Sequence, residues 1–183
     1  MGEGKRIAVE PLTPETFRPF GDVIRLRDRP DKIINAGLCG RHHDLAQLDF
    51  AESGRLGISL FDTEPRTLPY RLDLMERHPL GPQAFLPMHE RPFLVIVAAD
   101  EGGRPRVPRA FVTDGHEGVN YWRGTWHGVL APLGEGRLFA VVDWVGEGEN
   151  LEEWGLDEAW TIVGQPTAPL GRQASAPRLS SRT

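Results

Sequence analysis

Residues 72–83 contain polar side chains with the types and spacing of a catalytic or metal-binding site. Alternate residues of a β-strand point the same way. Interpreted as a strand, the stretch has one face formed by Leu72, Leu74, Glu76 and His78. Burying a carboxylate beside an imidazole is costly unless both are paired or bind a ligand. The prolines and glycine at 79–82 predict a turn, so Gln83 starts a returning strand and converges with Glu76 and His78.

A second imidazole, His127, ends the tetrapeptide Gly-Thr-Trp-His at 124–127 and supplies the other half of the predicted site. Histidine and glutamate are the side chains that most often carry general acid and base chemistry, and both also bind divalent metals. We therefore expect either proton transfer or metal binding where these segments meet.

The simplest alternative is a solvated strand face. Glu76 would then pair with Arg77 or Arg71, and such exposed ion pairs contribute little to stability. This interpretation leaves His78 and Gln83 without an explanation, so the site hypothesis is favoured.

The elements around these residues are predicted to be short strands separated by turns. Residues 56–61 alternate as a strand with Leu56, Ile58 and Leu60 facing inward. The continuous apolar run at 93–99 predicts a central strand, buried on both sides or at an interface. Residues 137–143 form another apolar strand. Many short strands favour a sandwich or small barrel, and the mouth of a barrel is where a small ligand binds.

Helices are expected to be few and short. Thr13 is a predicted N-cap, followed by Pro14 at the first helical position and Glu15 in the first turn. The acidic segment 150–160 is expected to form a second short helix. The predicted fold class is therefore all-β with a few short helices.

Composition is typical of one globular domain, since the 183 residues are 39% hydrophobic and 26% charged. A formal net charge of −5 argues against nucleic acid as a partner. The single cysteine, Cys39, rules out an internal disulfide and suits the cytoplasm, while no paired base marks it as a nucleophile. Membrane spans and a signal peptide are not expected. We expect the domain to occupy 1–163 and the segment 164–183, rich in Pro, Ser and Arg, to be a disordered tail.

The spacing of the polar residues resembles the two motifs of the cupin superfamily. The first cupin motif has two ligands one residue apart and a third five residues on, which Glu76, His78 and Gln83 match. The second has a glycine three residues before a histidine, which Gly124 and His127 match. The resemblance implies a cupin-like double-stranded β-helix, or small β-barrel. Cupins usually have His and Glu where this chain has Glu76 and Gln83.

Longer segments in the same order resemble the ureidoglycolate lyase family within that superfamily. The resemblance covers roughly residues 8 to 158. The segments that carry it are 12–24, 34–37, 41–46, 76–81, 83–85, 91–95 and 118–127.

This second resemblance implies a lyase that cleaves (S)-ureidoglycolate to glyoxylate and urea in allantoin and purine nitrogen catabolism. The implied acid, base or metal-ligand set is Glu76, His78 and His127, with Gln83 as a neutral fourth ligand. Two imidazoles and a carboxylate suit a divalent ion; the resemblance suggests nickel, with zinc as the other choice, and no organic cofactor. Which residue is the acid and which the base stays open.

Substrate binding requires a cation for the substrate carboxylate, and a bidentate arginine suits it. Arg41 is the first choice, with Arg91 and Arg123 as alternatives. The resemblance adds further substrate-binding residues, namely Asn35, His43, Asn120, Tyr121 and Trp126. Trp122 and Trp126 fit an ordinary core equally well. The apolar run at 93–99 and the family resemblance together suggest a homodimer.

Two other functions would use the same residues. A metal-dependent cupin dioxygenase or isomerase would hold iron with Glu76, His78 and His127, and oxygen dependence would distinguish it. A non-catalytic module that binds a small acid would bind glyoxylate tightly without turnover, although no DNA-binding segment accompanies the domain.

Overall fold

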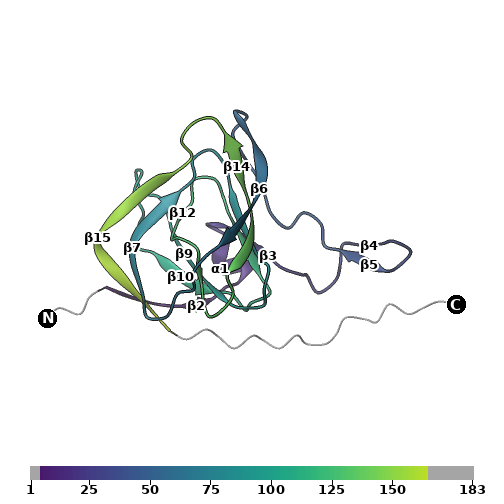
Figure 1. Ribbon diagram of the computed structural model, residues 1–183, viewed down its shortest axis with the longest axis horizontal. Helices are drawn as coiled ribbons and strands as arrows, with labels where there is room; N and C mark the ends of the chain where they lie inside the picture. Colours follow the sequence, from purple (N-terminus) through teal and green to yellow (C-terminus); the bar gives the residue numbers. More distant parts are fainter. Residues whose placement is uncertain (1–4, 165–183) are drawn as a thin grey trace.

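The computed structural model describes residues 5–164, and two β-sheets account for most of that range (Figure 1). The larger sheet has the spatial order β1 (Arg6–Ala8), β15 (Glu152–Val163), β7 (Tyr70–Arg77), β12 (Trp126–His127), β9 (Phe93–Ala98), β10 (Arg109–Val112) and β2 (Glu10–Pro11), with β13 (Ala131–Pro132) also paired to β9. The smaller sheet has the order β3 (Gly21–Ile24), β11 (Gly118–Tyr121), β8 (Gln83–Pro87), β14 (Leu138–Gly146) and β6 (Gly54–Asp62). Together the sheets form a nearly closed barrel, which confirms the all-β, cupin-like prediction.

Strand β9 separates two hydrophobic cores. Phe93, Val95 and Val97 point into the first core, between the two sheets, where they meet residues of β8, β10, β11 and β14. The alternate residues Leu94, Ile96 and Ala98 point into the second core on the opposite face of the larger sheet. All six are at most 2% exposed. The predicted central strand is confirmed, and it is buried within the chain rather than at an interface.

The helix α1 (Pro14–Phe17) begins as predicted, with a reciprocal cap. The Thr13 hydroxyl accepts a hydrogen bond from the backbone N–H of Thr16 (3.2 Å), and the Thr16 hydroxyl accepts one from the N–H of Thr13 (3.3 Å). The helix ends at Phe17, whose side chain is fully buried in the first core and so attaches α1 to the barrel.

The second expected helix, over 150–160, is wrong. Residues 152–163 form the long strand β15, which pairs antiparallel with β7 and parallel with β1. Trp154, Leu156 and Trp160 pack against the second core, while the acidic residues between them are mostly exposed. Burial of these aromatic side chains outweighs the weak helical preference of the acidic residues.

The inward faces of two strands also differ from the prediction. Leu72 lies in the second core together with Met75, three residues later, so the alternation breaks between them. Across from this point β15 has a register shift between Gly155 and Trp160. Leu72 therefore does not share the face of Glu76. On β6, Ile58 and Leu60 are 79% and 64% exposed and face outward.

A hairpin of β4 (Lys32–Ile34) and β5 (Cys39–Arg41) projects from the barrel as a separate two-stranded sheet (Figure 1). We call residues 32–41 the arm. Leu38 at its tip is 81% exposed. No helix in the described part of the chain is long and apolar enough to span a membrane. The predicted disordered tail, from residue 165 onward, lies outside the described residues.

We predict that Phe139→Ala lowers the free energy of unfolding by about 3–5 kcal/mol, because the ring is fully buried and packs edge-on against Phe93. The matched control is Leu26→Ala at a side chain that is 67% exposed, for which we expect a change within about 0.5 kcal/mol. Urea denaturation measures both values. Equal effects of the two substitutions would contradict the described core.

Candidate active site

Five strands bring polar side chains together at one end of the barrel interior. In the larger sheet, Glu76 of β7 lies opposite His127 of β12, whose other neighbour is Val97 of the first core. In the smaller sheet, Gln83 of β8 lies between Tyr121 of β11 and Asp143 of β14. Pairing of the strands thus places residues that are far apart in sequence around one space.

Glu76, His78 and His127 form the centre of this site. One ligand atom from each side chain lies within 4.8 Å of the other two. The imidazole centroids of His78 and His127 are 5.3 Å apart, and Tyr121 stacks on His127 at 4.3 Å with the ring planes 5° apart. The two motifs that the sequence analysis predicted to meet do meet.

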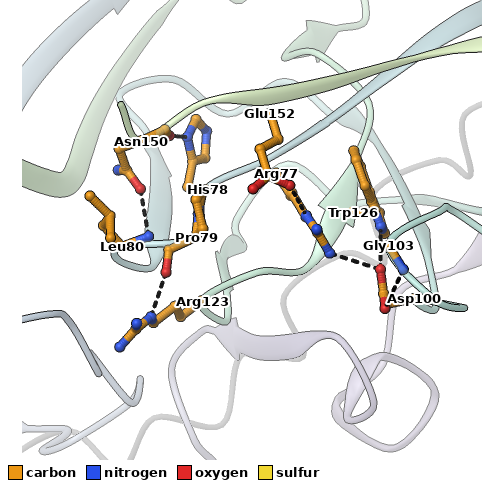
Figure 2. A network of polar contacts seen from close by, with 10 residues as sticks. All are labelled: Arg77, His78, Pro79, Leu80, Asp100, Gly103, Arg123, Trp126, Asn150 and Glu152. Atoms are coloured by element: carbon orange, nitrogen blue, oxygen red, sulfur yellow. Dashed lines mark hydrogen bonds and ion pairs between the residues drawn. The ribbon is translucent and has the colours of Figure 1, made fainter. Parts of the chain in front are cut away.

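Backbone carbonyls fix the tautomers of the two histidines. Nδ1 of His78 lies 2.5 Å from the carbonyl oxygen of Asn150, and Nδ1 of His127 lies 3.1 Å from that of Gly128 (Figure 2 shows the first contact). Because a carbonyl oxygen only accepts, both Nδ1 atoms carry the hydrogen. Each Nε2 therefore has a free lone pair, and both are buried without a partner among the described residues.

Burial sets the charges of the site. It lowers the pKa of His127 to about 3, with a further contribution from nearby His78. The ring is therefore neutral at pH 7, and the 3.8 Å approach of its Nδ1 to Glu76 is not an ion pair. Burial also raises the pKa of Glu76 from its ordinary value, which His78 partly opposes. The Tyr121 hydroxyl is fully desolvated, so its pKa is raised and it stays protonated.

These groups fit a divalent metal. Neutral imidazoles with free lone pairs and a carboxylate are the donors that zinc and nickel bind. The amide oxygen of Gln83 is likewise buried without a partner among the described residues and lies on the adjoining wall. The hydrogen bond from His78 to the Asn150 carbonyl is the kind of outer contact that orients a ligating histidine.

The solvated-face alternative for Glu76 is wrong. Arg77 pairs instead with Glu152 at 2.6 Å and Asp100 at 2.8 Å, and its guanidinium lies 4.5 Å from the centre of the Trp126 ring (Figure 2). Arg71 pairs with Asp73. Both arginines therefore have other partners, and the Glu76 carboxylate faces the barrel interior without either arginine.

Three arginines were predicted to bind the substrate carboxylate, and Arg123 is the one whose backbone neighbours the central cluster. Its Nε donates to the carbonyl of Pro79 at 2.6 Å, and the neighbouring Gly124 N–H donates to the carbonyl of His78 at 2.9 Å (Figure 2 shows the Arg123 contact). Its side chain is exposed. Arg91 is also exposed, but it follows the far end of β8 from Gln83.

The structure places the remaining predicted substrate-binding residues elsewhere. Asn35 and Arg41 lie on the arm, and Arg41 contacts the nearby His43 ring at 2.9 Å. Asn120 is fully buried on the other face of its strand, where its amide donates to Asp22 and to the carbonyl of Gln47. Trp126 belongs to the second core and donates to Asp100.

The sequence analysis missed Asp143 and Asn150. Asp143 lies beside the site on β14, and Asn150 holds both His78 and, through its side-chain oxygen, the N–H of Leu80 (Figure 2). A signal for Asp143 was present, because Phe139, Val141 and Asp143 alternate along one strand and the first two are core residues. Asn150 acts mainly through its backbone carbonyl, which sequence does not mark.

The barrel, the glutamate on β7, His78 just after that strand and His127 on β12 define a cupin-like protein with a candidate metal centre at one end of its interior. A sequence profile of the family described as ureidoglycolate lyase matches residues 4–163. The chain is 60% identical to "Ureidoglycolate lyase" of Rhodobacter capsulatus, over 87% of this chain and 99% of the relative. It is 50% identical to "Ureidoglycolate lyase" of Chelativorans sp., over 86% of this chain and 96% of the relative. It is 48% identical to "Ureidoglycolate lyase 1" of Rhizobium meliloti, over 85% and 92%. The chain belongs to the ureidoglycolate lyase family.

We predict that the metal-free protein loses stability as pH falls from about 6.5 toward 3. The unfolded chain protonates His127 near its ordinary pKa of about 6.5, whereas the folded chain does so at about 3. Protons therefore favour unfolding in that window. Melting temperatures at pH 7, 6 and 5 after chelation measure this effect. His127→Gln should flatten the profile, and an unchanged slope in that variant would contradict the assignment.

Proposed function

We propose that this protein is an enzyme that cleaves (S)-ureidoglycolate to glyoxylate and urea, within the breakdown of allantoin and purine nitrogen. The observation that carries the proposal is the cluster of Glu76, His78 and His127 at one end of the barrel interior of a chain from the ureidoglycolate lyase family. We also propose the cytoplasm as its location, on the basis of its single cysteine.

The reaction needs a balanced proton transfer. The hydroxyl O–H bond of the substrate breaks as the carbonyl of glyoxylate forms. The C–N bond breaks as that carbonyl forms, and the departing urea nitrogen gains a proton, so no net proton is consumed. Glu76 and His78 are half-buried, whereas His127 is 1% exposed. We assign to Glu76, His78 and His127 either the proton transfers or the holding of a metal, because a nitrogen that binds a metal has no lone pair left for a proton.

A divalent ion would be held by Glu76, His78 and His127, and we propose nickel, with zinc as the second choice. Such an ion supplies positive charge that stabilises a developing oxyanion. The exposed Arg123 guanidinium donates to the carbonyl of Pro79, the residue after His78, and we propose that it binds the substrate carboxylate. Arg41 is on the arm, so it would serve this role only in a site that the arm of a second copy reaches.

We expect purified protein to convert ureidoglycolate to equal amounts of glyoxylate and urea. A chelator should abolish most of the activity, because it removes the positive charge at the cluster, and nickel should restore it. The reaction should proceed equally with and without oxygen. Oxygen-dependent turnover would favour a dioxygenase, and tight glyoxylate binding without turnover would favour a binding module.

Substitutions should separate chemistry from binding. His78→Ala and His127→Ala should each lower kcat by about a hundredfold or more, because both imidazoles act where charge develops. Arg123→Ala should mainly raise KM, since the carboxylate keeps its charge throughout the reaction. Steady-state kinetics measure these effects, with circular dichroism as the control for folding. Near-normal kcat in either histidine variant would contradict the proposed site, and a KM effect in Arg41→Ala instead of Arg123→Ala would move the carboxylate contact to the arm.

We further propose that the protein is a homodimer that pairs through the outer face of β6. Ile58 and Leu60 are 79% and 64% exposed there, and β6 is the edge strand of the smaller sheet. An exposed apolar edge is a liability unless another surface covers it. Leu60→Lys should convert the dimer to a monomer in light scattering, whereas Val107→Lys, at an equally exposed residue outside this face, should not. A wild-type monomer at micromolar concentration would refute the proposal.

A further inference from the structure

Two hydrogen-bond acceptors face each other on the wall beside the central cluster. Gln83 and Asp143 are direct partners across β8 and β14, and Tyr121 lies on the other side of Gln83 in the same register. Tyr121 stacks on His127, whose ring centroid lies 5.3 Å from that of His78. Gln83 and Asp143 therefore line the same space as the histidines.

In the described part of the chain the Gln83 oxygen has no hydrogen-bond donor, and the Asp143 carboxylate has none besides its own backbone N–H. Gln83 is 7% exposed, and its Oε1 is buried without a hydrogen-bond partner. The Asp143 side chain is half-buried, and no hydrogen bond joins its carboxylate to another described residue. A buried acceptor without a donor costs free energy, so this pair favours a ligand that brings N–H groups.

The ureido end of the proposed substrate has the matching chemistry. Its terminal NH₂ group is neutral and presents two donors in one plane, one for each acceptor. Arg123 is exposed and donates to the carbonyl of Pro79, the residue after His78, so the substrate carboxylate and the ureido group would extend in different directions from the cluster. This arrangement leaves the carbon that bears the hydroxyl next to Glu76 and His78.

We propose that Gln83 and Asp143 together bind the terminal NH₂ of the ureido group and so determine specificity for it. The inference rests on the proposed function and assigns Gln83 to the substrate rather than to a metal. Substrates without these N–H donors leave both acceptors unpaired, and a site built on hydrogen bonds rejects such analogues strongly.

Product inhibition separates the two ends of the site. Gln83→Leu and Asp143→Ala should each raise the inhibition constant for urea by about tenfold, which is the loss of roughly one hydrogen bond. The inhibition constant for glyoxylate should change by less than about twofold, and KM for ureidoglycolate should rise. The matched control is Ser59→Ala, which lies beside Val141 on the same sheet and should leave both constants unchanged.

Three results would overturn the inference. Urea inhibition could be unchanged in both variants, glyoxylate inhibition could weaken as much as urea inhibition, or Gln83→Leu could lose affinity for nickel and zinc, which would make Gln83 a metal ligand. Direct calorimetry of urea and glyoxylate binding keeps the two proposals distinct. If the wild-type protein does not cleave ureidoglycolate but Asp143→Ala still weakens urea binding, the proposed function fails and the assignment of this pair stands.

Discussion

The buried imidazole of His127 is the constraint on which the site depends. A side chain that is 1% exposed and has a pKa near 3 holds no second proton at neutral pH, so its unpaired Nε2 is available to a ligand. The strand β12 that carries it is two residues long and lies between β7 and β9, which fixes the ring from both sides. The stacked Tyr121 ring adds an apolar cover. The barrel thus holds this imidazole in a dry, rigid location, where burying its unpaired nitrogen costs free energy that a bound ligand would recover.

The polar contacts around this location form two sets with different roles. One set orients the histidines through backbone carbonyls, at Asn150 and Gly128. The other set, around Arg77, joins Glu152, Asp100 and the Trp126 ring and thereby connects β7, β15 and the second core (Figure 2). Because Arg77 is fully used in this second set, Glu76 next to it keeps a free carboxylate. Adjacent residues of one strand therefore serve stability on one face and chemistry on the other.

Local sequence patterns predicted the features that are determined by residues close together in the sequence. Spacing and residue type were enough to predict the capped helix at Thr13, the strand at 93–98 that is buried on both faces, and the proximity of His78 to His127. Patterns failed where a distant strand decides the outcome. Leu72 faces the second core because the alternation of β7 breaks opposite the register shift in β15, and no residue near Leu72 signals this. Ile58 and Leu60 face outward because the first core lies on the other face of β6.

The segment between β14 and β15 illustrates how the backbone controls the reactivity of a distant side chain. Asn150 at its end accepts from the His78 ring with its carbonyl and from the Leu80 N–H with its side chain. An insertion or deletion at 147–149 would move that carbonyl away and allow the imidazole to switch tautomers, although no catalytic side chain had changed. For protein engineering, this connection is therefore a poor place to graft a peptide, despite its exposed position on the surface.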